Sequence, residues 1–317
     1  MFEACGIEGG EVMPAVRTFT FSPDSVRAAV AAKARTAVSV CIPCRNEAAT
    51  IGSIVSQIIC ALMVGPTPLV DELVVMDDGS TDATVAVASA AGARVVAVTD
   101  VLKDAGPGMG KGNALWKSVA ASRGDVIVWC DGDLLSFTPE YVRRLVLPFL
   151  LDPTVMLVKG FYERLLDDAG EGGGRNTELV ARPLLALLFP ELASVHQPLG
   201  GEYAARRVVL EQVPFAEGYG VEIGLLLDVA TLTGPSSVVQ VDLGVRRHRH
   251  RPLRELSAQS VEIMHALLHR AGLDPRQLRA PLAYPDTAVD SAPLTRPIAL
   301  HLAERPPLLS VTGYPSA

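Results

Sequence analysis

An acidic pair, Asp131 and Asp133, stands directly after an apolar run at residues 125–130. The run is typical of a buried parallel strand, and ligands in open α/β sheets bind beyond the carboxyl ends of such strands. Two carboxylates separated by Gly132 can hold a hard divalent cation and leave room for phosphate oxygens. An ordinary Asp-Gly turn at a strand end has the same appearance. The functional interpretation is a metal–diphosphate site, as in enzymes that use nucleotide sugars.

Polar clusters also follow two earlier apolar runs, predicted as strands at residues 38–43 and 72–76. The clusters are P-C-R-N-E at 43–47 and D-D-G-S at 77–80. Because parallel strands end at the same edge of a sheet, we expect these clusters to lie beside the acidic pair. Three polar clusters at one edge are hard to explain as chance turns, and they favour a binding site there.

A glycine-rich loop at residues 106–112 precedes a predicted helix and carries Lys111. A lysine and free backbone amides at a helix N-terminus are a phosphate-binding arrangement. The loop is not a P-loop, because Ala105 and Gly112 stand where that motif has glycine and Ser/Thr. The alternative is a mobile surface loop with an exposed lysine.

Two further segments carry candidate ligand-binding residues. In G-G-G-R-N-T-E (172–178), backbone amides, Arg175 and Thr177 could hold a phosphate or carboxylate, or the segment could be a hinge with a capping residue. In the basic run at 246–251, His248 could bind a metal, although such a run is usually a solvated strand end. His265 and His269 lack the H-E-x-x-H pattern and indicate only a helix face.

Short strands alternating with helices predict an α/β fold with a mostly parallel, doubly wound sheet flanked by helices. The strands are expected at 38–43, 72–76, 93–98, 125–130, 155–162 and 240–245, and the helices at 25–35, 47–62, 111–122, 138–150, 177–189, 221–232 and 257–271.

Bulk composition limits the class of protein. The 317 residues carry a net charge of −7 with 49% hydrophobic residues, which indicates a globular protein and argues against nucleic acid as a partner. The N-terminus lacks a signal-peptide pattern, and the apolar stretch at 51–64 is too short to cross a bilayer, so no membrane partner is expected. Five cysteines exclude a disulfide framework and fit a cytoplasmic location; Cys41 and Cys44 are expected to be structural.

The motifs together resemble a known family. I-P-C-R-N-E, D-D-G-S-T-D and D-G-D resemble the family-2-like GT-A glycosyltransferases. The match is closer to the actinobacterial glucosyl-3-phosphoglycerate synthases, relatives of the mannosyl-3-phosphoglycerate synthases. It spans residues 36–255, with an echo in R-P-P at 305–307. The segments that carry it are G-K-G-N-A-L-W (110–116), G-G-G-R-N-T-E-L-V-A-R-P-L-L (172–185), G-E-Y-A-A-R (201–206), P-F-A-E-G-Y-G-V-E-I-G-L-L (214–226) and L-G-V-R-R-H-R-H-R-P-L (243–253).

The resemblance implies a GT-A fold, a Rossmann-like mostly parallel sheet with a C-terminal acceptor-binding part. It suggests an N-terminal extension (1–35), a nucleotide-sugar-binding subdomain (36–135), an acceptor-binding subdomain (136–273) and a C-terminal tail (274–317). The tail is Pro-rich and polar, and we expect it to wrap the surface or a partner subunit. Family membership also implies a homodimer.

The resemblance assigns roles to individual residues. The catalytic positions are Glu222, an acidic residue near the reacting sugar; Asp133; and Leu199, whose backbone carbonyl approaches the sugar. The nucleotide-sugar positions are Pro43, Arg45, Glu47, Ser80, Lys111, Asp131 and Gly132. The acceptor positions are Gly174, Arg175, Thr177, Tyr219 and His250, and the metal ligands are Asp133 and His248. At two of these positions the sequence departs from its relatives: Gly132 stands where they carry serine, and His250 where they carry asparagine.

The implied reaction moves glucose from UDP- or GDP-glucose to the 2-hydroxyl of 3-phosphoglycerate, with retained configuration and with Mg²⁺ or Mn²⁺. Glu222 could act as a nucleophile or only position the sugar; attack on the face that the leaving group departs from is the preferred hypothesis. A mannosyl transfer from GDP-mannose is the nearest alternative. A sugar-1-phosphate nucleotidyltransferase would need a glycine-rich loop after the first strand, which is missing. A non-catalytic nucleotide-sugar binder would not need both aspartates, Lys111 and His248.

Overall fold

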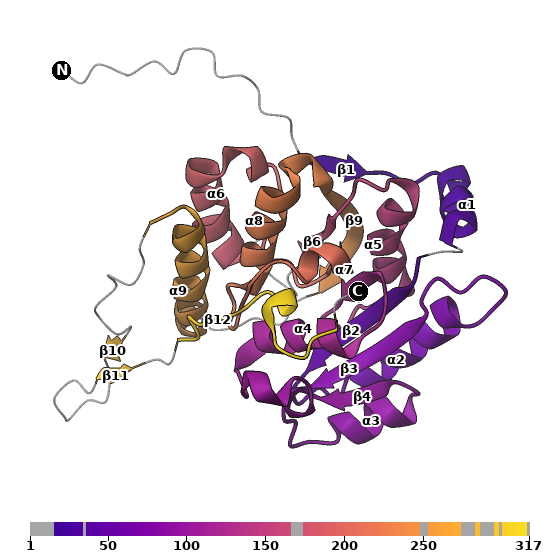
Figure 1. Cartoon of the computed structure of the whole chain (residues 1–317), viewed down its shortest axis with the longest axis horizontal. Helices are drawn as coiled ribbons and strands as arrows, with labels where there is room; N and C mark the ends of the chain where they lie inside the picture. The colour runs from indigo at the N-terminus through magenta and orange to yellow at the C-terminus, as the bar shows by residue number, and fades with distance from the viewer. Residues whose placement is uncertain are drawn as a thin grey trace, which may run out of the picture.

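The computed structural model describes residues 16–33, 36–165, 174–247, 253–273, 283–285, 295–297 and 300–315. Its centre is one eight-stranded sheet with the order β1-β9-β6-β7-β5-β2-β3-β4 (Figure 1). The strands are β1 (Arg17–Phe19), β2 (Val38–Cys44), β3 (Glu72–Asp77), β4 (Arg94–Ala97), β5 (Val126–Trp129), β6 (Leu157–Leu165), β7 (Tyr203–Arg206) and β9 (Val238–Arg247).

The sheet is mostly parallel, as the alternation of strands and helices predicts. β2 pairs in parallel with β3 and β5, and β3 with β4, so the carboxyl ends of these strands share one edge. β7 is the exception: it runs antiparallel between β5 and β6. β1 and β7 were not predicted from the sequence. β1 pairs with β9, so residues 17–19 of the expected N-terminal extension belong to the sheet.

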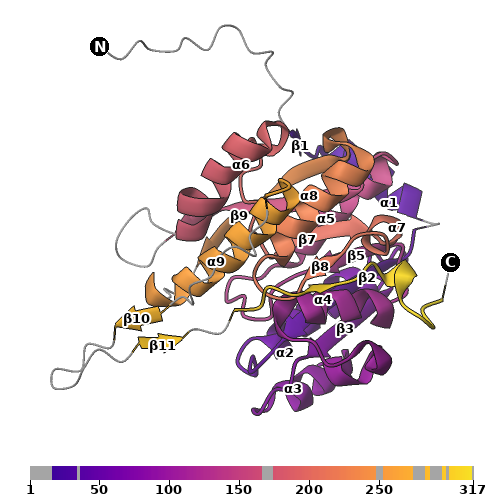
Figure 2. The same cartoon turned by 60° about the vertical axis from the view of Figure 1, so that its left-hand side comes forward.

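Helices cover both faces of the sheet, and each face has its own apolar core (Figure 2). Side chains of α4, α6, α8 and α9 fill one core, and those of α2, α3 and α5 fill the other. The helices are α1 (Pro23–Ala32), α2 (Ile51–Ile58), α3 (Thr84–Ala90), α4 (Gly110–Ala121), α5 (Pro139–Leu151), α6 (Arg182–Leu188), α7 (Arg207–Leu210), α8 (Val221–Thr233) and α9 (Leu253–Arg270).

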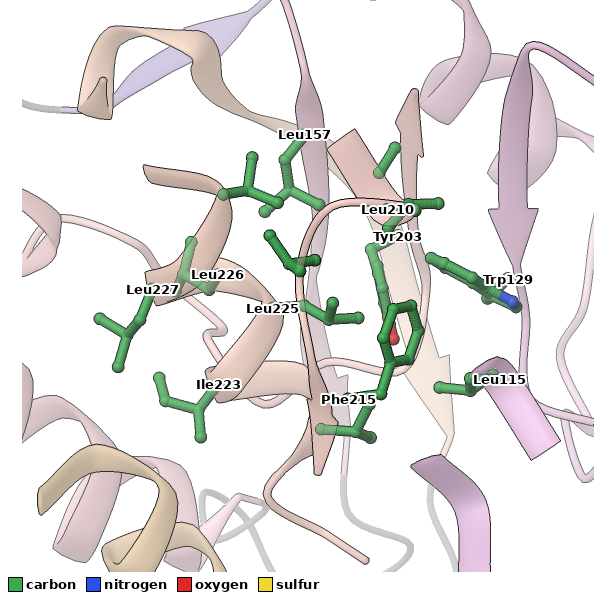
Figure 3. Packing of buried hydrophobic residues seen from close by; sticks show 14 of the residues in the cluster. Leu115, Trp129, Leu157, Tyr203, Leu210, Phe215, Ile223, Leu225, Leu226 and Leu227 are labelled. Carbon is green, nitrogen blue, oxygen red and sulfur yellow. The ribbon is translucent and has the colours of Figure 1, made fainter. Parts of the chain in front are cut away.

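Aromatic packing anchors the centre of the first core. Trp129 of β5 lies against Tyr203 of β7, with ring centroids 4.9 Å apart, and against Phe215 at 6.4 Å. Figure 3 shows these rings between the sheet and the leucines of α8. Burying three such side chains contributes several kcal/mol, about 2 for each. The core thereby fixes β5, whose next residues are the acidic turn, relative to α8.

Several predicted helices begin at other residues than expected; α9, for example, starts at Leu253 and not at residue 257. The helix expected from Glu47 begins at Ile51, because Asn46 takes a left-handed conformation (φ +60°) and a turn occupies residues 48–50; a π-helical turn, Ile59–Met63, then continues α2. The helix expected at 177–189 starts with another π turn, Thr177–Ala181, before α6. π turns often occur at functional sites.

Residues 300–315 of the C-terminal tail pack on the body of their own chain. β12 (Glu304–Arg305) pairs antiparallel with β8 (Phe215–Ala216), and Leu308 is fully buried. Two more short strands, β10 (Ala283–Pro285) and β11 (Thr295–Pro297), pair with each other. Part of the tail therefore lies on the surface of its own chain; the expectation for the whole tail and the four-part division of the chain stay predictions. Among the described helices, none has the length and apolar character needed to cross a membrane.

Candidate active site

The loops after β2 and β3 are joined to each other, as their shared sheet edge implies. The backbone N–H of Asn46 donates to Ser80 Oγ at 3.0 Å, and Asn46 Oδ1 accepts from the N–H of Thr81 at 2.8 Å. Asparagine tolerates the left-handed conformation of this residue. Burial raises the pKa of the nearby Asp78, and the charge of Arg45 opposes that rise. The predicted positions Arg45 and Ser80 therefore lie in one polar cluster.

The acidic turn after β5 packs tightly on the end of β2. A side chain at Gly132 would meet Cys44 Sγ at 2.6 Å and the Pro43 carbonyl oxygen at 3.3 Å, so a larger residue here would have to displace Cys44. Glu47 Cγ would lie 3.5 Å away, and Thr50 Oγ1 donates to the Gly132 carbonyl at 2.6 Å. The structure brings the predicted donor-site residues of β2 and the acidic turn together.

Lys111 connects the acidic turn to α8. Its Nζ lies 2.7 Å from Asp131 Oδ1 and 2.7 Å from Glu222 Oε1. Burial lowers the pKa of Lys111, but the two carboxylates outweigh it and raise the pKa well above its usual value. The lysine therefore stays protonated. Glu222 is only 5% exposed. The pair therefore joins a buried carboxylate of α8 to the Lys111 ammonium group of α4.

A loop at residues 197–201 covers this ion pair. A side chain at Gly201 would meet Asp131 Oδ1 at 2.5 Å and Lys111 Nζ at 2.7 Å, so the backbone passes directly over both groups. Leu199, whose carbonyl the family resemblance places near the sugar, lies two residues earlier. The structure thus groups Lys111, Asp131 and Glu222 beneath the loop that carries Leu199.

A second group of predicted residues lines a cavity of about 330 Å³ beside this loop. Gly174 and buried Thr177 lie on its wall. The other lining residues, which the sequence did not indicate, are Phe161, Tyr162, Glu178, Arg182, His196 and Gln197. Arg175 lies next to Gly174 in the sequence. Tyr219 is 40% exposed, and its backbone N–H donates to Glu262 Oε2 at 2.7 Å.

The loop before Lys111 is braced from the far end of the chain. Arg305 of β12 donates from Nε to Asn113 Oδ1 at 2.9 Å and from Nη1 to the Ala105 carbonyl at 2.6 Å. Its Nε also lies 2.9 Å from Glu217 Oε1, and its guanidinium covers the Trp116 ring. Only the R-P-P echo at 305–307 signalled this contact in the sequence.

The predicted metal site is not fully covered by the described residues. His248 and His250 lie outside the described residues, so the pairing of His248 with Asp133 stays a prediction. Within the described ranges, no three His, Cys, Asp or Glu side chains gather as a metal site.

The cysteines and histidines that were expected to be structural have structural surroundings. Cys41 and Cys44 are buried free thiols, and burial raises the pKa of Cys41 to about 12, which fits a structural role. His265 and His269 stack along α9.

Comparison with known proteins gives consistent matches. Residues 39–213 match the family described as "Glycosyl transferase family 2". The glucosyl-3-phosphoglycerate synthase of Mycolicibacterium smegmatis is 48% identical over 285 residues, which is 89% of this chain and 92% of that protein. The enzyme of that name from Petrotoga mobilis is 44% identical over 237 residues, 74% of this chain and 73% of that protein.

Solved structures agree with these matches. The glucosyl-3-phosphoglycerate synthase from Mycobacterium tuberculosis in complex with Mn²⁺, uridine diphosphate and glucosyl-3-phosphoglycerate has a TM-score of 0.82 and 44% identity, over 93% of this chain and 99% of that chain. A complex of the same enzyme with Mn²⁺, UDP-glucose and phosphoglyceric acid has a TM-score of 0.80 and 44% identity, over 94% and 99% of the two chains. The α/β GT-A fold expected from the sequence is confirmed.

Proposed function

Because the chain belongs to glycosyl transferase family 2, and within it to the glucosyl-3-phosphoglycerate synthases, we propose that it transfers glucose from UDP-glucose to the 2-hydroxyl of 3-phosphoglycerate. The observation that carries this proposal is the Asp131–Lys111–Glu222 cluster, which lies beside the polar clusters of β2 and β3 and beneath the 197–201 loop. Such a cluster presents a fixed cation where a diphosphate leaving group gains negative charge.

On the donor side, Lys111 would bind the diphosphate, while Arg45, Glu47 and Ser80 hold the nucleoside. The permanent charge of Lys111 supports this role, because a protonated lysine stabilises the departing nucleotide without a proton transfer. Glu222 is already paired with Lys111 at 2.7 Å. A carboxylate held by an ammonium group is a weak nucleophile, so we assign Glu222 to positioning the sugar and prefer attack on the face that the leaving group departs from.

A divalent metal fits the acidic turn. The carboxylates of Asp131 and Asp133 are hard oxygen donors, which suit Mg²⁺ or Mn²⁺. The related enzyme from Mycobacterium tuberculosis is solved with either ion together with uridine diphosphate. Asp133, which is exposed, would hold the ion together with His248 and donor phosphate oxygens. When bound, the ion supplies Lewis-acid stabilisation of the leaving diphosphate.

On the acceptor side, the cavity beside the loop would take 3-phosphoglycerate. Backbone at Gly174, the Arg175 guanidinium and the buried Thr177 offer donors to a phosphate or carboxylate. Tyr219 stands before α8, the helix that carries Glu222. This local group of donors would let a chain of net charge −7 bind a strongly anionic acceptor.

The test is an assay of nucleoside-diphosphate release with 3-phosphoglycerate and, in turn, UDP-glucose, GDP-glucose and GDP-mannose, with and without Mg²⁺. Release with UDP-glucose that needs both acceptor and metal is the expected result. Release only with GDP-mannose would assign a mannosyltransferase instead. Pyrophosphate release would indicate a nucleotidyltransferase, and donor binding without any turnover a non-catalytic binder.

Two alanine variants separate the donor side from the acceptor side. Asp133→Ala should reduce transfer about a thousandfold, because the leaving diphosphate loses its metal. Arg175→Ala should raise KM for 3-phosphoglycerate at least about tenfold and leave the affinity for UDP unchanged. Arg94→Ala, at an exposed ion pair with Glu72, is the control that should keep wild-type kinetics. Normal turnover of Asp133→Ala and Arg175→Ala would overturn these two assignments.

We also propose that the protein is a homodimer that works in the cytoplasm. The family expectation supports the dimer, and the predominance of buried free thiols among the described cysteines agrees with a reducing compartment. Light scattering during gel filtration measures the oligomeric state directly. A mass of one chain would contradict the dimer without affecting the proposed reaction.

A further inference from the structure

A row of side chains crosses four neighbouring strands beneath the candidate active site. Register aligns Gln240 of β9, Lys159 of β6, Tyr203 of β7 and Trp129 of β5. Lys159 Nζ lies 4.4 Å from the centre of the Tyr203 ring, and Tyr203 packs on Trp129 (Figure 3). Trp129 Nε1 donates to Ser118 Oγ of α4 at 2.9 Å. The row therefore joins β9 to α4, the helix whose first turn carries Lys111.

Lys159 is an unusual member of this row, because it is a lysine with only 2% of its surface exposed. Burial lowers its pKa to about 8, against the opposing charges of Glu222, Glu202 and Asp131, while Lys111 lowers it further. A buried ammonium is costly and is kept only where it has partners. Its described hydrogen bond goes to the Gly200 carbonyl oxygen, at 2.8 Å.

That bond fixes the loop over the ion pair. Gly200 precedes Gly201, whose backbone touches Asp131 and Lys111, and it follows Leu199. Gln240, the next member of the row, holds the start of the same loop: its Oε1 accepts from the His196 N–H at 3.0 Å. Two members of the row therefore hold residues 196–200: Gln240 bonds to His196 at one end, and Lys159 bonds to Gly200 at the other.

We propose that Lys159 is a positioning residue for glucosyl transfer: its bond to Gly200 holds the 197–201 loop so that the Leu199 backbone faces the transferred sugar and Gly201 stays against the Lys111–Asp131 pair. This inference rests on the proposed function. It assigns no contact with substrate to Lys159. Its effect is on the geometry of the reacting groups, where a shift of about 1 Å can cost about a hundredfold in rate.

The test compares Lys159→Met with Lys33→Met. Methionine has a similar length but no charge and no donor, so the loop is released. Lys33 pairs with Asp71 at 2.7 Å, and that pair lies at the amino end of β2, away from the site, which makes it the matched control. For Lys159→Met we expect kcat to fall about a hundredfold, with KM for UDP-glucose and affinity for UDP within about threefold of wild type. Lys33→Met should keep wild-type kcat.

A second variant keeps the proposal testable if Lys159→Met does not fold. Gln240→Met releases the other end of the loop and should also lower kcat while UDP binding persists. Unchanged kcat in the folded variants would overturn the proposal, as would a loss of UDP affinity that matches the loss of activity, because that pattern indicates a general structural role. The wild type is assayed first: absence of wild-type turnover contradicts the proposed function, whereas wild-type turnover with unaffected variants contradicts only the role of Lys159.

Discussion

At the scale of single residues, Gly132 and Cys44 form a complementary pair. The thiol occupies the space that a side chain at 132 would need, since a Cβ there would lie 2.6 Å from Cys44 Sγ. We expect Gly132→Ser to displace the acidic turn, to cost about 2 kcal/mol of stability and to reduce transfer about tenfold. Adding Cys44→Ala should restore part of both losses, because it removes the clashing atom.

A double-mutant cycle measured by thermal denaturation and by turnover checks this pairing. Cys44→Ala alone is the reference and should cost about 1 kcal/mol for the small cavity that it leaves. Strictly additive effects of the two substitutions would show that the serine is tolerated by another movement. In that case the glycine would not be required by the sulfur atom.

At the scale of elements, the C-terminal strand β12 holds the loop before α4. Arg305 supplies this link through Asn113, Glu217 and the Ala105 carbonyl. Arg305→Met leaves these groups without their buried cation, so we expect a loss of about 3 kcal/mol in stability. The KM for UDP-glucose should also rise, because the freed loop leads directly into the first turn of α4, where Lys111 lies. Urea unfolding and donor titration measure the two effects. Arg94→Met, which removes a half-exposed arginine, should change neither.

The elements also show what local sequence could predict. The strands beside the acidic turn were predictable because continuous apolar runs such as 126–130 indicate burial on both faces. β7 was not, because its four residues Tyr203–Arg206 carry little pattern and gain their structure by pairing antiparallel with β5 and β6. The start of α2 was misplaced because the Asn46 turn depends on hydrogen bonds to Ser80 and Thr81, more than thirty residues away.

At the scale of the whole molecule, the candidate site is assembled across the entire chain. Motifs located Lys111, Asp131 and Glu222, but their contact depends on how α4, β5 and α8 pack. Lys159 carried no signal, because a lysine within an apolar strand gives no indication of which carbonyl it will meet. Arg305 was indicated only by the resemblance of R-P-P at 305–307 to the family, and its partner Asn113 lies 192 residues away in the sequence. Sequence therefore indicated the candidate site residues better than the residues that hold them in place.

The N-terminal strand gives a test of stability at this same scale. Arg17 of β1 pairs with Asp152 at 2.6 Å, at the end of α5, and Thr154 donates to the same carboxylate. Hydrogen bonds from Thr154 and Arg17 lower the pKa of Asp152 to about 2. Because the folded-state pKa lies below the unfolded one, the stabilisation is complete above pH 4 and disappears as the pH falls toward 2.

Asp152→Asn should therefore destabilise the protein by about 1 kcal/mol near neutral pH, a figure that allows for solvent screening of the half-exposed Arg17. The difference from wild type should shrink as the pH is lowered from 4 toward 2, and urea unfolding at a series of pH values measures it. Asp100→Asn, in an exposed pair with Lys103, is the control and should show no such trend. A difference that stays constant over this range would mean that the Asp152 charge does not attach β1 to the body. The attachment would then depend on the backbone pairing of β1 with β9 and on hydrogen bonds such as that from Gln240 to Thr18.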